Sequence, residues 1–306
     1  MNCRFKASIV GCGSVGATTA YSYLLSGTVT DMALVDRNKG KATGLKLDLE
    51  HSTAFTPNLN IQAGDDYDAC AGSNIVVITA GARQKEGETR LDLIAKNREI
   101  FAEMIPKITA AAPNAIFIIV SNPVDILTHE TIKISGLPAN RVIGSGTLLD
   151  SARLQFHISQ KINIHPSSID AYILGEHGDS SFPVYSFANV LGKPLTEFEE
   201  FSDEVAKECY EETKNAAYRI INDMGYTCYS IATAIRELTD SIFANSKKVF
   251  PVSTLLQDYY GHSDVCLSMP CVIGQAGIEK AIDIPLNEEE QKLLAKSVST
   301  LKSYSK

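Results

Sequence analysis

The chain has 306 residues, 44% of them hydrophobic and 21% charged, which is the composition of an ordinary globular protein. A formal net charge of −8 without a basic run argues against a nucleic-acid partner. No apolar stretch approaches the roughly 20 residues that a membrane-spanning helix needs. We expect a cytoplasmic protein without a signal peptide, because the first predicted strand starts almost at the N-terminus.

The seven cysteines are scattered without CxxC pairs, and the six histidines show no metal-ligand spacing. Reduced thiols are therefore expected, with neither a disulfide framework nor a metal site.

The first half of the chain alternates short apolar runs with helical segments. Strands are predicted at Phe5–Val10, Met32–Val35, Ile75–Thr79, Ala115–Val120 and Arg141–Ile143. Strands that are apolar along their whole length suit a parallel sheet covered by helices on both faces. The β-α-β order implies right-handed crossovers and a doubly wound α/β fold.

The pattern changes near Gly144, where we place the boundary between residues 1–143 and a second, α+β domain of residues 144–306. This part is predicted to hold helices at 148–161, 197–223 and 227–245, a strand at 168–174, a strand-rich stretch at 265–284 and a closing helix. Asn287 and Glu290 are spaced as the capping box of that last helix.

The first strand runs into the glycine-rich sequence GCGSVG, residues 11–16, and the second strand ends at Asp36. Glycines at this spacing allow a tight turn and close approach of a pyrophosphate to a helix N-terminus. A carboxylate at Asp36 would accept the ribose hydroxyls of NAD and repel the 2′-phosphate of NADP, although Arg37 could weaken that preference. We predict a Rossmann domain that binds NAD, with Cys12 serving as a small residue in the turn.

Three further groups of residues could carry chemistry. The polar connection from Gly81 to Arg90 is longer than most strand-to-helix loops, as a mobile cover over a site would be. Asp150 and Arg153 share a helix face, and His177 follows a strand between two glycines. Taken singly, these features also fit a solvated loop, a surface ion pair and a loop histidine.

Together the segments GCGSVG, AGARQKEGETR, VSNPVD, DSARL, GEHGD and GYTCYSI resemble the lactate/malate dehydrogenase family over essentially the whole chain, and bacterial L-lactate dehydrogenases most of all. The resemblance implies reversible hydride transfer between NADH and pyruvate, the step that forms L-lactate in fermentation. It implies cofactor contacts from Gly11, Gly13, Ser14, Val15, Gly16, Asp36, Gly81, Ala82, Asn122 and Ile231.

The resemblance also implies the catalytic roles. His177 matches the family's proton donor and acceptor, and Asp150 matches the carboxylate that holds its imidazole. Arg153 matches the arginine that binds the substrate carboxylate through two parallel hydrogen bonds. Arg90 matches the arginine that polarises the carbonyl. Asn122 and Thr227 match residues that line the substrate pocket.

Malate dehydrogenases resemble this chain, but at the loop position of Gln84 they carry arginine. An unpaired second carboxylate facing glutamine should cost about 3–5 kcal/mol, which favours pyruvate over oxaloacetate. Arg83 leaves an alternative open, because a one-residue shift in register would put arginine inward. A malate dehydrogenase or a broader 2-hydroxy acid dehydrogenase is therefore the alternative function. A non-catalytic NAD-binding protein is a remote third alternative.

Two departures from the bacterial pattern concern regulation and assembly. Gln155 and Asp170 stand where activated relatives carry an arginine and a histidine for fructose 1,6-bisphosphate, so little or no activation is expected. The chain lacks the long N-terminal arm of vertebrate relatives. A homotetramer is nevertheless expected, with a dimer as the alternative.

Overall fold

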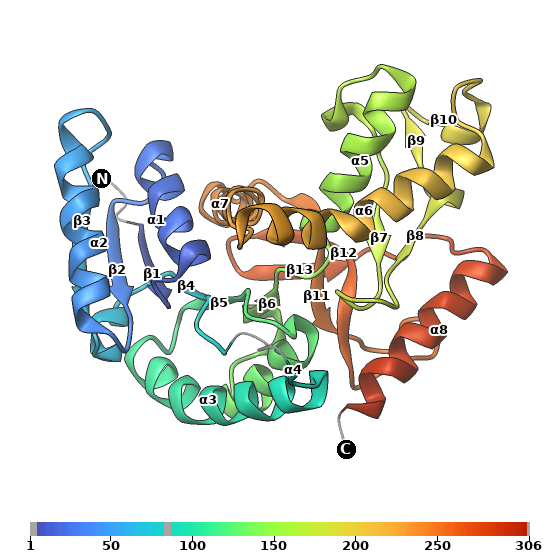
Figure 1. Cartoon of the computed structure of the whole chain (residues 1–306). Helices are drawn as coiled ribbons and strands as arrows, with labels where there is room; N and C mark the ends of the chain where they lie inside the picture. The colour runs from blue at the N-terminus through green and yellow to red at the C-terminus, as the bar shows by residue number, and fades with distance from the viewer. Residues whose placement is uncertain (1–4, 83–86, 305–306) are drawn as a thin grey trace.

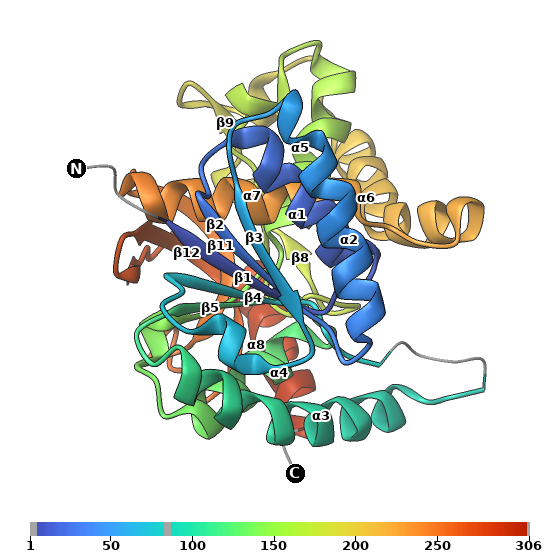
Figure 2. The same ribbon diagram turned by 90° about the vertical axis from the view of Figure 1, so that its left-hand side faces the viewer.

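The computed structural model describes residues 5–82 and 87–304, and its central feature is one nine-stranded sheet with helices on both faces (Figure 1, Figure 2). Six neighbouring strands are parallel and lie in the order β3-β2-β1-β4-β5-β6. Their bounds are β1 Lys6–Val10, β2 Asp31–Val35, β3 Asn60–Gly64, β4 Ile75–Ile78, β5 Ile116–Ile119 and β6 Val142–Gly144. This order confirms the predicted doubly wound Rossmann sheet.

Three antiparallel strands extend the same sheet beyond β6. They are β11 Lys248–Leu255, β12 Cys266–Gly274 and β13 Gly277–Ala281. Strand β11 meets β6 where Ser253 pairs with Gly144. Because the sheet is continuous at the expected boundary, the division into residues 1–143 and 144–306 stays a prediction.

Helices cover the sheet and form most of the remaining structure. The first four are α1 Ser14–Ser26, α2 Lys39–His51, α3 Arg90–Ala111 and α4 Val124–Ser135. The later four are α5 Leu148–Ile162, α6 Asp203–Met224, α7 Tyr229–Ala244 and α8 Glu288–Ser303. Asn287 and Glu290 form the predicted capping box of α8, which satisfies backbone N–H groups at its start.

The alternation of side chains along the parallel strands explains why both faces are apolar. Ile75 and Val77 of β4 join the core that includes α1 and α7, whereas Val76 and Ile78 join the core beneath α3 and α4. A third, smaller core packs α5 and α6 around two short hairpins. The hairpin strands are β7 Ile173–Leu174, β8 Phe182–Pro183, β9 Asn189–Val190 and β10 Lys193–Pro194.

Some predicted boundaries were wrong. The strand expected at 168–174 is regular only at Ile173–Leu174, and the helix expected from 197 begins at Asp203, after the Ser202 cap. The sequence reading also missed β3 and β11. Strand β3 alternates exposed and buried residues at the sheet edge, and β11 contains Pro251, which lacks the N–H that a ladder needs.

Candidate active site

The glycine-rich turn joins β1 to α1 at the carboxyl edge of the parallel strands. Gly11 has a φ of +101°, and a Cβ there would lie 2.6 Å from the Ala80 nitrogen. A Cβ on Gly13 would meet nothing within 4 Å. Protein packing therefore requires glycine at Gly11, while the open side of Gly13 fits close approach by a pyrophosphate at the N-terminus of α1.

Asp36 follows β2 and lies against this turn. One carboxylate oxygen accepts the Cys12 N–H at 2.7 Å, and the other accepts the Asn38 N–H at 2.9 Å. The half-buried carboxylate is thus oriented beside the glycines, as a ribose-binding residue would be. Burial, aided by Asp36, raises the pKa of the Cys12 thiol to about 12, so this thiol stays protonated.

His177, Asp150 and Arg153 form a hydrogen-bonded group between α5 and the loop after β7. The His177 Nδ1 lies 2.6 Å from one Asp150 oxygen, and the Arg153 guanidinium lies 3.1 Å from the other. The side chain of His177 is 29% exposed, whereas those of Asp150 and Arg153 are 16% and 13% exposed. The Asp150 contact holds the imidazole by Nδ1, which leaves Nε2 to face a substrate.

Electrostatics in this group favour an ionised pair. Burial lowers the pKa of His177, but the charge and hydrogen bond of Asp150 outweigh it, so the pKa of the imidazole is raised. Burial likewise raises the pKa of Asp150, but His177 and Arg153 outweigh it and leave that pKa lowered. The raised pKa of His177 favours the protonated imidazole, the form that can donate a proton.

Arg90, the first residue of α3, reaches the same loop from the other side of the site. Its guanidinium forms an ion pair with Glu176, the buried neighbour of His177, and lies 5.1 Å from the centre of the Tyr304 ring. The start of α3 is defined by a capping box between Thr89 and Asp92. The structure thus brings Arg90 next to the His177 loop, held by a partner that sequence reasoning missed.

Asn97 of α3 was not among the predicted site residues, yet it organises the start of the polar loop. Its side chain is fully buried, accepts the Ala82 N–H at 2.7 Å and donates to the Asn122 carbonyl at 2.7 Å. The peptide bond before Pro123 is cis. A buried amide among apolar residues at helical spacing was the signal that could have identified Asn97, because such a group needs partners.

For the remaining predicted site residues that it describes, the structure gives a location in the fold but no contact with the His177 group. Thr227 lies half-buried in the connection between α6 and α7, and Ile231 lies in the first turn of α7, packed against the main core. Gln84 falls outside the described residues. The pocket roles of these three residues stay predictions.

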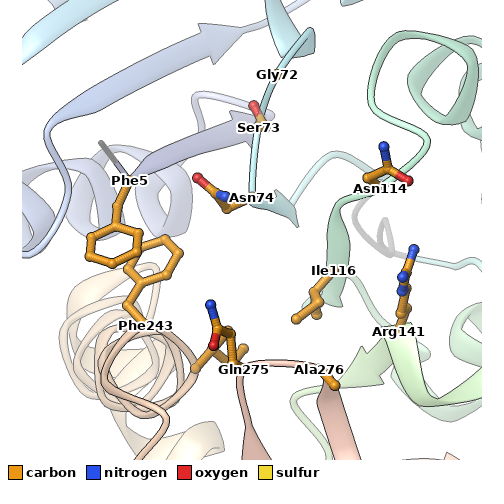
Figure 3. Close-up of a pocket in the computed structure, with 11 residues that line it drawn as sticks. Phe5, Gly72, Ser73, Asn74, Asn114, Ile116, Arg141, Phe243, Gln275 and Ala276 are labelled. Atoms are coloured by element: carbon orange, nitrogen blue, oxygen red, sulfur yellow. The ribbon is translucent and has the colours of Figure 1, made fainter. Parts of the chain in front are cut away.

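A cavity of about 360 Å³ lies at the opposite, amino-terminal edge of the parallel strands (Figure 3). Its lining includes Asn74, Asn114 and Arg141, and the rings of Phe5 and Phe243 stack at 4.4 Å beside it. No predicted catalytic or cofactor residue lines it, so it is separate from the site around His177.

Within residues 5–82 and 87–304, no cluster of three or more His, Cys, Asp or Glu side chains could hold a metal ion. The six cysteines of these ranges are free and buried. None of the helices in the same ranges is long and apolar enough to cross a membrane.

Comparison with known proteins decides the family. The model of the lactate/malate dehydrogenase NAD-binding domain matches residues 5–144, and that of the α/β C-terminal domain matches residues 147–306. The chain belongs to the lactate/malate dehydrogenase family. The resemblance seen in the motifs is thereby confirmed.

Individual members of the lactate/malate dehydrogenase family are similar over nearly their full length. An L-lactate dehydrogenase from Clostridium botulinum is 48% identical, covering 97% of this chain and 95% of its own. An L-lactate dehydrogenase from Acetivibrio thermocellus is 45% identical, over 98% of this chain and 96% of its own length. The solved minor L-lactate dehydrogenase of Enterococcus mundtii is 37% identical, with a TM-score of 0.95 and coverage of 98% and 97%.

Proposed function

We propose that this protein is an L-lactate dehydrogenase that interconverts pyruvate and L-lactate with NADH and NAD. The observation that carries the proposal is the His177–Asp150–Arg153 group, in which a carboxylate holds a histidine of raised pKa and also pairs with an arginine. The relatives at 45–48% identity, all named L-lactate dehydrogenase, support the same reaction.

His177 supplies the proton in the reductive direction. When bound, NADH would provide the hydride for one face of the pyruvate carbonyl carbon. Protonated His177 donates from Nε2 to the carbonyl oxygen, and Asp150 stabilises the imidazolium until that transfer. In the oxidative direction, neutral His177 takes the hydroxyl proton of lactate.

The two arginines bind and polarise the substrate. Arg153 uses one nitrogen on Asp150 and has further N–H groups for the pyruvate carboxylate. Arg90 pairs with Glu176 in this structure and must exchange that partner for the carbonyl oxygen to stabilise the developing alkoxide. Asn122 and Thr227 complete the proposed pocket.

The cofactor site is assigned to the glycine-rich turn and Asp36. The open side of Gly13 and the oriented carboxylate fit a dinucleotide. Because that carboxylate would repel a 2′-phosphate, NAD is preferred over NADP. Gly81, Ala82 and Ile231 belong to the proposed nicotinamide side.

The preference for pyruvate rests on Gln84, and the ratio of kcat/KM for pyruvate over oxaloacetate tests it. We expect the wild-type enzyme to prefer pyruvate and Gln84→Arg to shift the ratio toward oxaloacetate by roughly 10²–10⁴, because arginine pairs the second carboxylate. A wild-type enzyme that prefers oxaloacetate would refute the lactate assignment and favour malate. No NADH oxidation with either acid would favour a non-catalytic NAD-binding protein.

We also propose a cytoplasmic homotetramer. Large apolar side chains are exposed on α1 and α6, including Leu25 at 53% and Tyr218 at 69%. Apolar surface of this kind is typical of faces that pack against other subunits. Sedimentation velocity would distinguish tetramer from dimer.

A further inference from the structure

Asp125 is a buried carboxylate beside the catalytic histidine that the proposed mechanism does not use. It lies in the first turn of α4, directly after the Asn122–Pro123 segment, and is 2% exposed. One carboxylate oxygen, Oδ2, accepts the backbone N–H of His177 at 2.7 Å. No hydrogen bond of good geometry reaches the other oxygen, Oδ1, within the part of the chain that the structure describes, although the Ser253 hydroxyl, itself without such a bond, interacts with the carboxylate.

A charged group in such a place needs a reason, because burying a carboxylate with an unpaired oxygen is costly. The N-terminal end of α4 offers partial positive charge, which offsets part of that cost. An uncharged acceptor could hold the His177 amide equally well. We therefore ask which nearby group the negative charge stabilises, and the cation that interacts with Asp125 is the imidazole of His177.

We propose that Asp125 is a positioning residue for His177, which holds the backbone amide of the histidine and, as a second carboxylate close to it, favours the protonated imidazole. This inference rests on the proposed function, since it concerns the proton that His177 donates to pyruvate. His177 then lies between two carboxylates from different elements. Asp150 on α5 holds the ring, and Asp125 on α4 holds the main chain.

The charged and titratable groups around the pair are consistent with this role. Burial raises the pKa of Asp125 to about 6, and Ser253, the His177 amide and the His177 charge oppose the rise. Asp125 in turn raises the pKa of His177, whereas Arg153 lowers it. The groups that face the two residues are Glu176 of the loop, Ser253 of β11, Cys266 of β12, and Asp150 and Arg153 of α5.

The sign of the expected pH effect follows from these neighbours. An ionised Asp125 favours the imidazolium, so removing its charge lowers the pKa of His177. Pyruvate reduction requires the imidazolium and is lost as pH rises through that pKa. The alkaline limb of the pH profile should therefore move to lower pH when Asp125 is neutral.

Asp125→Asn tests the proposal, because the amide oxygen can still accept the His177 N–H while the charge is gone. We expect the alkaline limb of kcat/KM for pyruvate to move down by roughly half to one pH unit. The matched control is Asp264→Asn, the same change in an exposed carboxylate that pairs with His129 and not with His177. Its alkaline limb should stay in place.

A purely structural role for Asp125 would lower activity equally at every pH and leave the limb unmoved, and that result overturns the proposal. If Asp125→Asn does not fold, Asp125→Ser carries the test, because it also removes the charge and leaves a neutral hydroxyl oxygen as the acceptor. Its alkaline limb should move down as in Asp125→Asn. An unmoved or upward-shifted limb in that variant contradicts the proposal.

A third variant separates this inference from the proposed function. If His177→Asn abolishes pyruvate reduction but the limb is unmoved in Asp125→Asn, the reaction assignment stands and the positioning role fails. If His177→Asn retains activity, the acid–base assignment itself fails.

Discussion

At the scale of single residues, the site works by surrounding one histidine with fixed charges. Asp150 raises the pKa of His177 against the opposing effect of burial, and His177 and Arg153 together lower the pKa of Asp150. Glu176 holds Arg90 near the same loop. Asp150 and Arg153 thus hold the imidazole in place before substrate arrives, which limits its reorganisation, whereas Arg90 must still leave Glu176 to act on the substrate.

Arg90→Gln should separate catalysis from cofactor binding. Glutamine removes the positive charge that stabilises the developing alkoxide, so kcat for pyruvate reduction should fall by about 10²–10³. Steady-state assays give kcat, and fluorescence titration gives the affinity for NADH, which should change far less. An unchanged kcat would rule out this role for Arg90.

At the scale of elements, the site is assembled where four segments meet. The start of α3, the start of α4, helix α5 and the loop after β7 each bring one part of it, and buried polar side chains join them. Asn97 links Ala82 to Asn122, and Asp125 links α4 to His177. Such links fix the segments relative to one another more firmly than apolar contacts, because each buried polar group must be satisfied.

Asn97→Ala should destabilise the protein and loosen the start of the polar loop. The change leaves the Ala82 N–H and the Asn122 carbonyl without their buried partner, at a cost of about 2–3 kcal/mol. Urea denaturation at one protein concentration measures this cost. Asn222→Ala, an exposed asparagine in α6, serves as the control and should change stability by less than about 0.5 kcal/mol. Equal stability of the two variants would contradict the linking role.

At the scale of the whole molecule, one sheet carries both the cofactor edge and the support for the catalytic half. The parallel strands direct their carboxyl ends toward the glycine turn, Asp36 and Asn122, while β11–β13 continue the sheet under α5 and the His177 loop (Figure 1). This continuity makes the relative position of the glycine turn and the His177–Asp150 pair a property of the fold.

Fructose 1,6-bisphosphate should not activate this enzyme. The structure places the predicted effector positions together, since Gln155 donates to the carbonyl of Ala171, next to Asp170. Neither side chain is cationic, and the exposed Asp170 carboxylate would repel a phosphate. Rates at limiting pyruvate with and without the bisphosphate should agree within about twofold. A larger activation would show that other cations form the site.

The sequence by itself determined the parallel sheet and the family, and it supplied the candidate cofactor turn and the catalytic residues that we propose. Strands buried on both faces must be apolar throughout, and the glycine turn, His177 and Arg153 stand in motifs whose spacing is local. Only the tertiary structure decided how β11–β13 join that sheet and which buried groups support the site. Asn97, Asp125 and Glu176 acquire their roles from partners 15 to 86 positions away. No local pattern records such pairings, because they exist only when the chain is folded.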